Sequence, residues 1–195
     1  MGKIYYIMGK SSSGKDTMFK EIQKRLPELQ TVTLYTTRPM REGEKNGGEY
    51  FFVPEETLEI YEQEGKVIEL RTYNTIHGPW KYATIDDGQV VLEEADYLMI
   101  GTLKSYDGIC SYYGAENVVP LYLQVEDGER LFRALSRERA QVSPRYAELC
   151  RRFLADIEDF SEEKLKKAGI TRRYNNNDKI QCIEEIIGDI QHGKL

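Results

Sequence analysis

The order of apolar and polar positions predicts a strand, a loop and a helix at the start of the chain. The apolar run Ile4–Met8 predicts a buried strand, and a loop rich in glycine and serine follows it. Met18, Ile22 and Leu26 then recur at helical spacing until Pro27 ends the pattern. A strand, a glycine loop and a helix in this order are typical of the first unit of a parallel α/β sheet.

The rest of the chain predicts an insertion and then a return to the main sheet. Short β-like runs at 50–53 and 67–70 surround a short helix at 55–64, and a second short helix is expected at 86–94. Further elements are expected as strands at 97–100 and 118–125, a helical region from 128 onward with a polar break at 141–144, a strand near 170–174 and a final helix at 180–190.

Composition and charge exclude several classes of partner. The formal net charge is −6, and a field of this sign repels nucleic acid and anionic membranes, so neither is expected as a partner. The N-terminal pattern does not predict a secretion signal, and no apolar run approaches membrane-spanning length. The 3 cysteines fit neither a zinc site nor a redox pair and indicate a reducing compartment, so a cytoplasmic protein is expected.

The loop after the first strand fits the phosphate-binding pattern Gly-x-x-x-x-Gly-Lys. Glycines allow backbone N–H groups to surround a phosphate chain, and the next helix directs its N-terminus at the same anion. We expect Lys15 to add a positive charge at the β- and γ-phosphates of ATP. The residues expected to bind this nucleotide are Gly9, Lys10, Ser11, Ser12, Ser13, Gly14, Lys15, Asp16 and Thr17.

Asp16 stands where this pattern normally has a hydroxyl, and Thr17 supplies the nearest one. Mg²⁺ is expected to bind mainly through the phosphates, with Asp16 or Thr17 as candidate ligands. Asp16 alternatively favours the positive end of the helix, which is the reading that we prefer.

A second set of residues resembles a known family. The stretch 36–44 reads Thr-Thr-Arg-Pro-Met-Arg-Glu-Gly-Glu, and 47–52 reads Gly-Gly-Glu-Tyr-Phe-Phe. Together with the phosphate loop, these runs resemble the guanylate kinase family, and the weaker similarity extends from about Lys3 to about Ile190. The resemblance implies transfer of a phosphoryl group from ATP to GMP or dGMP, with Mg²⁺.

The resemblance also implies which residues hold the acceptor nucleotide. Arg38 and Arg41, which are three residues apart, together with Tyr50 would bind its phosphate, since a guanidinium fork binds phosphate bidentately. Glu69 would accept two hydrogen bonds from the donor edge of guanine.

Several positions depart from the family pattern. Lys10 and Ser12 replace a proline and a glycine, Leu34 replaces a serine that helps to read the base, and 78–82 reads Gly-Pro-Trp-Lys-Tyr instead of Gly-Asn-Tyr-Tyr-Gly. The stretch 100–105 lacks both acids of the family's Asp-x-Asp-x-Gln-Gly. Thr102 could supply one hydrogen bond there, and Lys81 could supply charge to the acceptor phosphate. Phosphoryl transfer is therefore better supported than the choice of acceptor base.

Seven arginines and no lysine lie in one short window: Arg130, Arg133, Arg137, Arg139, Arg145, Arg151 and Arg152. By resemblance, Arg137 and Arg152 lie before and after a mobile lid, where Arg137 would contact ATP and Arg152 the acceptor. Catalysis is then expected from Lys15, Arg38, Arg137 and Arg152. For Arg130, Arg139 and Arg151 we expect ion pairs with neighbouring glutamates instead.

These observations predict an α/β fold with a P-loop parallel sheet core flanked by helices. The expected core comprises 1–32, 83–125 and 165–195, with an inserted small β-rich acceptor-binding lobe at 33–82 and a helical lid at 126–164. The expected partners are small-molecule nucleotides, and either a monomer or a homodimer fits the sequence. Two alternatives stay open: a kinase for another phosphorylated acceptor, such as another nucleotide or a ribose bisphosphate, and a non-catalytic protein-binding module.

Overall fold

The computed structural model describes residues 1–48, 50–75 and 78–193, and these residues form two β-sheets. The larger sheet has five strands in the order β2-β7-β1-β8-β9, and every neighbouring pair is parallel. Its strands are β1 (Ile4–Met8), β2 (Gln30–Thr31), β7 (Tyr97–Gly101), β8 (Val118–Gln124) and β9 (Tyr174–Asn175). The predicted parallel core is confirmed.

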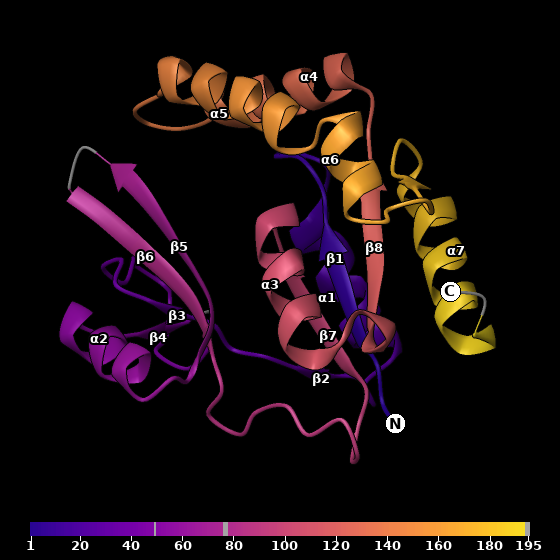
Figure 1. The fold of residues 1–195 in the computed structure, drawn as a ribbon. Helices are drawn as coiled ribbons and strands as arrows, with labels where there is room; N and C mark the ends of the chain where they lie inside the picture. Colours follow the sequence, from indigo (N-terminus) through magenta and orange to yellow (C-terminus); the bar gives the residue numbers. More distant parts are fainter. Residues whose placement is uncertain (49, 76–77, 194–195) are drawn as a thin grey trace.

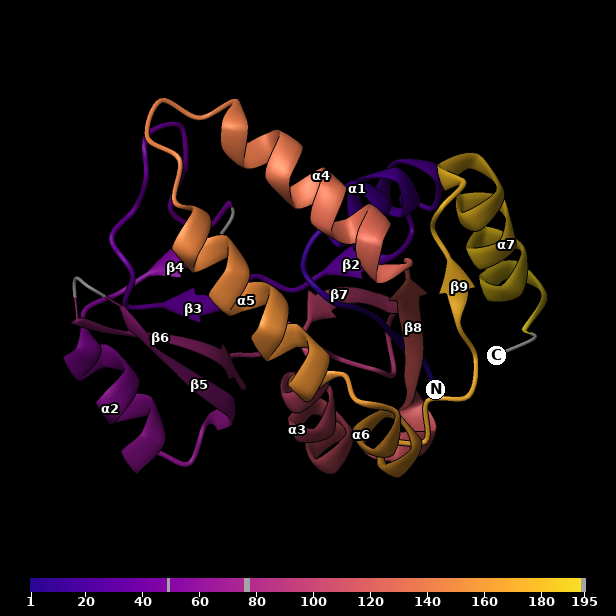
Figure 2. The same cartoon turned by 90° about the horizontal axis from the view of Figure 1, so that it is seen from above.

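Helices cover both faces of this sheet (Figures 1 and 2). Successive side chains of a strand point to opposite faces, and the fully buried β1 supplies both cores in this way. Tyr6 packs with α3 (Leu103–Tyr113) and α6 (Glu162–Lys167), whereas Ile7 packs with α1 (Lys15–Arg25) and α7 (Lys179–His192). This explains why the first strand lacks polar positions.

The smaller sheet has four strands in the order β4-β3-β6-β5. The hairpin of β5 (Val67–Thr75) and β6 (Gly78–Ile85) is antiparallel, β3 (Tyr35–Thr36) pairs antiparallel with β6, and β4 (Phe51–Phe52) pairs parallel with β3. A small apolar cluster around Leu58 joins α2 (Glu55–Gln63) to one face of this sheet. Helix α3 lies against β5 and so connects the two sheets.

Helices α4 (Asp127–Arg139) and α5 (Tyr146–Asp159) lie above the carboxyl ends of the core strands (Figure 1). They pack against each other and extend from the phosphate loop toward the smaller sheet (Figure 2). None of the helices in the described part of the chain combines the length and the apolar character needed to cross a bilayer.

The predicted elements agree with the structure in most places. The first strand and helix, the short helix at α2, the break between α4 and α5 and the final helix are confirmed. The short helix expected at 86–94 is wrong, because Gly88 adopts φ +84° and the Asp87 carboxylate accepts from the backbone N–H of Gln89, which fixes a turn. The last strand begins at Tyr174 instead of near Ile170.

Candidate active site

The phosphate loop connects β1 to α1 and holds Lys15 over its own backbone. Gly14 precedes the helix in a left-handed conformation, with φ 89° and ψ 16°. The Lys15 ammonium donates to the carbonyls of Gly9 at 2.8 Å and Lys10 at 3.2 Å. The loop therefore has the conformation that brings its lysine to the N-terminus of the helix, where anions are favoured.

Asn176, just after β9, supports the loop from behind. Its side-chain amide donates to the Ser13 carbonyl at 2.7 Å, and a Cβ at Gly14 would lie only 2.5 Å from that amide nitrogen. Only glycine fits this close approach at positive φ. Within the described residues, two buried side-chain oxygens lack a hydrogen-bond partner, and both belong to this contact region: Ser13 Oγ and Asn176 Oδ1.

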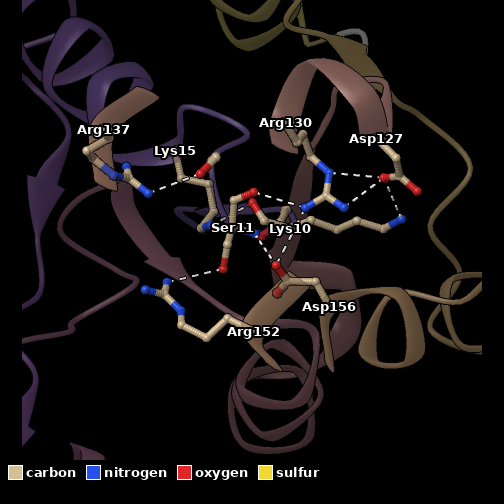
Figure 3. Close-up of polar contacts among 10 residues, drawn as sticks. Lys10, Ser11, Lys15, Asp127, Arg130, Arg137, Arg152 and Asp156 are labelled. Atoms are coloured by element: carbon tan, nitrogen blue, oxygen red, sulfur yellow. Dashed lines mark hydrogen bonds and ion pairs between the residues drawn. The ribbon is translucent and has the colours of Figure 1, made fainter. Parts of the chain in front are cut away.

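The two arginines expected in the lid both reach the loop (Figure 3). Arg137 of α4 donates to Ser12 Oγ at 3.0 Å, and Arg152 of α5 donates to Ser11 Oγ at 3.2 Å. Lys15 and two guanidinium groups from separate helices are thus gathered around one loop.

An ion network centred on a buried arginine, which the sequence did not predict, lies beside these residues (Figure 3). Arg130, which is 1% exposed, contacts Asp127 at 2.7 Å and Asp156 at 3.5 Å, and it donates to the Ser11 carbonyl at 3.0 Å. Asp156 accepts from the backbone N–H of Ser11 at 2.8 Å. Lys10 pairs with Asp127 at 3.3 Å. The network therefore joins the loop, α4 and α5.

Three arginines of this window were expected to form ion pairs with neighbouring glutamates, and one of them does. Arg151 pairs with Glu148 at 2.7 Å, as expected for a solvated helix face. Arg130 is buried among aspartates instead, because its side chain turns under the loop, and Arg139 forms no ion pair with any described residue.

Burial is the main influence on the electrostatics of Lys15. It lowers the pKa of the ammonium group, while the carboxylates of Asp16 and Asp156 oppose that effect and the guanidinium groups of Arg152 and Arg130 add to it. The lysine is thus poorly solvated in the protein alone, a condition that an incoming phosphate relieves.

A cavity of about 300 Å³ opens beside the loop. It is lined by Ser12, Gly14, Thr17, Met18, Arg133, Arg137, Asn176 and Lys179. Its position between the start of α1 and α4 suits a nucleotide whose phosphates enter the loop. Asp16 and Thr17 are both exposed in the first turn of α1.

The residues expected at the acceptor phosphate form a second charged group on the smaller sheet. Arg38 is buried and forms a bidentate pair with Glu44 at 2.8 and 2.9 Å, and its guanidinium lies over the rings of Tyr50 and Phe52 at 5.5 and 5.2 Å. Glu44 also accepts from the backbone N–H of Arg41, whose side chain is exposed. Hydrogen bonds to Glu44 come first among the causes that raise the pKa of Arg38.

Tyr82, which the sequence reasoning did not single out, joins this group. Its ring packs edge-on against Tyr50 at 5.6 Å, and Tyr82 contributes to the raised pKa of Arg38 after the Glu44 hydrogen bonds. Lys81 points to the opposite face of β6, where it pairs with Glu55 of α2. This geometry does not support Lys81 as a phosphate ligand, because adjacent strand residues face opposite sides of a sheet.

Glu69, expected to read the base, is buried in a polar cluster of its own. It pairs with Arg71 at 2.9 Å and accepts from the Thr84 hydroxyl at 2.9 Å. Thr102 caps the N-terminus of α3, where its hydroxyl accepts from the Ser105 backbone N–H. Glu49 of the family pattern and His77 lie outside the described residues.

Comparisons with known proteins place these observations in context. The sequence model of the guanylate kinase family matches residues 1–87. A guanylate kinase from Legionella pneumophila is 36% identical over 78 residues, which are 40% of this chain and 37% of that relative. A guanylate kinase from Thermotoga maritima is 28% identical over 146 residues, which are 72% of this chain and 68% of that relative.

The chain spans less than half of the length of the first curated relatives that it matches. A crystal structure of guanylate kinase from Anaplasma phagocytophilum shares the fold, with a TM-score of 0.64 at 19% identity over 100% of this chain and 87% of that one. The matched segment contains both the phosphate loop and the Arg38 group. Residues 1–87 therefore match the guanylate kinase family, and the whole chain shares the fold of a guanylate kinase.

Proposed function

We propose that this protein transfers a phosphoryl group from ATP to a nucleoside monophosphate, with GMP or dGMP as the acceptor. One observation carries the proposal: Lys15, Arg137 and Arg152 meet at the phosphate loop from three separate elements. Charge spread over the transferring phosphoryl group is stabilised by such prearranged cations.

The donor site is proposed at the loop and the adjacent cavity of about 300 Å³. Two buried oxygens of this region, Ser13 Oγ and Asn176 Oδ1, lack a hydrogen-bond partner in the protein. Buried polar atoms are normally paired, so these two atoms support a loop that binds a ligand. Arg137 reaches the same loop and would hold the transferring phosphate.

Mg²⁺ is proposed as the accompanying ion, held mainly by the nucleotide's phosphates. The described residues contain no cluster of three His, Cys, Asp or Glu side chains that could hold a metal. The exposed Asp16 and Thr17, next to Lys15, fit an ion that is shared with the phosphates. When bound, Mg²⁺ would neutralise part of the negative charge of the phosphates.

The acceptor phosphate is proposed to bind at Arg38, with Arg41 and Tyr50 as further hydrogen-bond donors. We propose that Tyr82, and not Lys81, is the residue of β6 that contacts this phosphate. Arg38 is oriented in advance by its bidentate pair with Glu44 and by two aromatic rings. A side chain fixed in this way loses little entropy when a phosphate binds. The exposed Arg41 can close over the same anion.

This reading divides the chain by role. We propose that 33–82 forms the acceptor-binding lobe, that 126–164 forms a lid, and that 1–32, 83–125 and 165–195 form the core. The lid excludes water, which would otherwise hydrolyse ATP. The three cysteines are free, which supports a reducing, cytoplasmic location. The partners are small-molecule nucleotides.

A coupled assay of ADP release tests the function. The acceptor panel contains GMP, dGMP, AMP, CMP, UMP and a ribose bisphosphate, and we expect release with GMP or dGMP. Release only with the ribose bisphosphate would replace the proposed acceptor. No release with any acceptor would favour a non-catalytic binding module.

Two lysines of α1 provide the matched pair of variants. Lys15→Ala should abolish transfer, because it removes the cation at the transferring phosphate. Lys20→Ala, on the exposed side of the same helix, should leave the rate unchanged. Equal rates in both variants would remove Lys15 from the mechanism.

A further inference from the structure

The helices α4 and α5 keep their apolar side chains outside the protein core. Arg130 is the one buried residue of α4, and no residue of α5, which is described over its full length, is buried. A surface helix normally buries its apolar stripe against another element. The apolar side chains of these two helices therefore lack such a partner among the described residues.

The most exposed of these side chains point away from the phosphate loop. Arg130 of α4 and Asp156 of α5 both contact the backbone of Ser11. Phe132 and Leu154 each lie two residues from one of these contacts, which is about 200° around the helix. Both side chains are 66% exposed. The two helices lie along the upper boundary of the molecule in Figure 1, and the view from above in Figure 2 shows no other described element over them.

Three further apolar side chains extend this surface across both helices. The Arg130 guanidinium lies 4.7 Å from the ring centre of Phe153, so this side of α5 faces α4. Ile157, one helical turn after Phe153, lies on the same side of α5 and is 42% exposed. On α4, Leu131 and Leu135 are one turn apart and are 39% and 40% exposed.

These side chains form one apolar surface, which we call the outer patch: Leu131, Phe132, Leu135, Leu154 and Ile157. At these exposed fractions, and with about 200 Å² for a large apolar side chain, the patch presents roughly 500 Å² to solvent. A contiguous patch of that size is typical of an interaction surface. With a polar rim, it approaches the area that each partner buries in a stable interface, about 800 Å².

The charges beside the patch change sign along α5. Arg151, Leu154 and Glu158 follow each other at positions i, i+3 and i+7, so they share one side of the helix. Arg151 now pairs with Glu148 at 2.7 Å and Glu158 with Lys164 at 2.9 Å, and all four side chains are solvent-exposed. Exposed ion pairs contribute little to stability, so both charges can exchange partners when another molecule binds.

A second copy of the chain in antiparallel orientation satisfies both the patch and the charges. A two-fold axis that passes through Leu154, perpendicular to α5, places this helix against its equivalent in the partner. Leu154 then meets its own equivalent, and Arg151 lies near Glu158 of the partner subunit on both sides of the axis. A parallel copy would place like charges opposite each other. An anionic membrane fits less well, because the chain carries a net charge of −6.

We propose that the outer patch is a self-association surface, through which two copies of this chain pair by antiparallel α5 helices. The phosphate loop lies on the opposite side of both helices, so pairing leaves it open to ligands. Arg137 and Arg152 project from the same two helices toward the loop. The dimer therefore joins the helices that carry these arginines in the two copies.

Sedimentation velocity of the protein from about 1 to about 100 μM tests the association, since a patch of this size suits a Kd in the micromolar range. We expect a dimer that dissociates on dilution. Leu154→Arg should weaken the dimer by about 100-fold or more, because it places two charges against each other at the two-fold axis. Ile60→Arg, at a 52% exposed apolar position of α2, is the matched control and should leave the dimer unchanged.

Exchange of the charges tests the antiparallel orientation. Arg151→Glu and Glu158→Arg should each weaken the dimer by about tenfold, because each one places like charges opposite each other. The double variant should restore the wild-type Kd, since the same attraction returns with its signs reversed. A double variant that is as weak as the single ones would contradict the antiparallel arrangement.

The wild-type measurement decides the inference by itself. A protein that stays monomeric over the whole concentration range would overturn it. A dimer that survives Leu154→Arg would also overturn it, because the contact would then lie on another surface. If Leu154→Arg does not fold, as judged by circular dichroism, Phe132→Arg tests the same patch from α4. None of these measurements depends on phosphoryl transfer, so their outcome is separate from that of the proposed function.

Discussion

Asp156 provides the sharpest test of how α4 and α5 are attached to the phosphate loop. Its carboxylate accepts from the Ser11 backbone N–H at 2.8 Å and lies 3.5 Å from the guanidinium of Arg130. The side chains of Asp156 and Arg130 are 15% and 1% exposed, so water screens this contact poorly. We therefore expect Asp156→Asn to destabilise the folded protein.

The size of this destabilisation depends on the ion-pair partner that Arg130 retains in the variant. Removing one partner of a buried pair costs about 3–5 kcal/mol when the other charge is left alone. Arg130 still has Asp127, which it contacts through Nη2 at 2.7 Å and Nε at 3.1 Å. The loss should therefore be nearer to that of one charged hydrogen bond, about 1.5–3 kcal/mol. At about 2–4 °C per kcal/mol for a chain of this size, Tm should fall measurably.

Urea unfolding and thermal scans of three variants measure the effect. Glu158→Gln is the control on the same helix, because Glu158 pairs with Lys164 in an exposed contact that is worth at most about 1 kcal/mol. The double variant with Arg130→Met should recover stability, since a hydrophobic replacement of a buried pair is often neutral. If Asp156→Asn is no more destabilising than Glu158→Gln, the network does not anchor α4 and α5 to the loop.

Three further predictions follow from contacts in the site. Gly14→Ala should destabilise the loop by about 1–2 kcal/mol, because φ is +89° there, and should weaken ATP binding measured by calorimetry. Hydrogen bonds from Arg38 lower the pKa of Glu44 to about 2, so the stabilisation from this carboxylate is present above pH 4.5 and disappears as the pH falls toward 2. Glu44→Gln should therefore lower the free energy of unfolding above pH 4.5. An acid titration of the variant should lack the loss of stability that the wild type shows between pH 4.5 and 2. Arg137→Ala and Arg152→Ala should each lower kcat by roughly 10³-fold with little change in Tm.

Local patterns were sufficient to predict the elements whose signals lie within one segment. Strand, glycine loop and helix follow directly from the buried run Ile4–Met8 and the spacing of Met18 and Ile22. The break between α4 and α5 follows from a run of polar residues and Pro144. In each case burial of one face and the turn chemistry agree, so no knowledge of distant contacts was needed.

Features that depend on contacts between segments could not be predicted in the same way. Helix α3 was missed although Thr102 and Ser105 form a capping box, since the stretch was compared with a strand end of the family. Lys81 and Tyr82 are neighbours, but a shift of one residue changes the sheet face. Neither the sequence spacing nor the resemblance indicates that Asp156 would meet the loop, because 145 positions separate it from Ser11.

The partners of the arginines separate those that hold the fold from those that remain available to a phosphate. Arg71 and Arg130 are each buried against a carboxylate, so their charge is already balanced. Arg38 also pairs with a carboxylate, that of Glu44, and this pair orients it for the acceptor phosphate that we propose it binds. Arg137 and Arg152 instead contact neutral serine hydroxyls and form no ion pair with any described residue. A phosphoryl group in transfer carries negative charge that only unbalanced cations can neutralise fully. In a chain with net charge −6, that leaves Lys15, Arg137 and Arg152 as the local positive field at the loop.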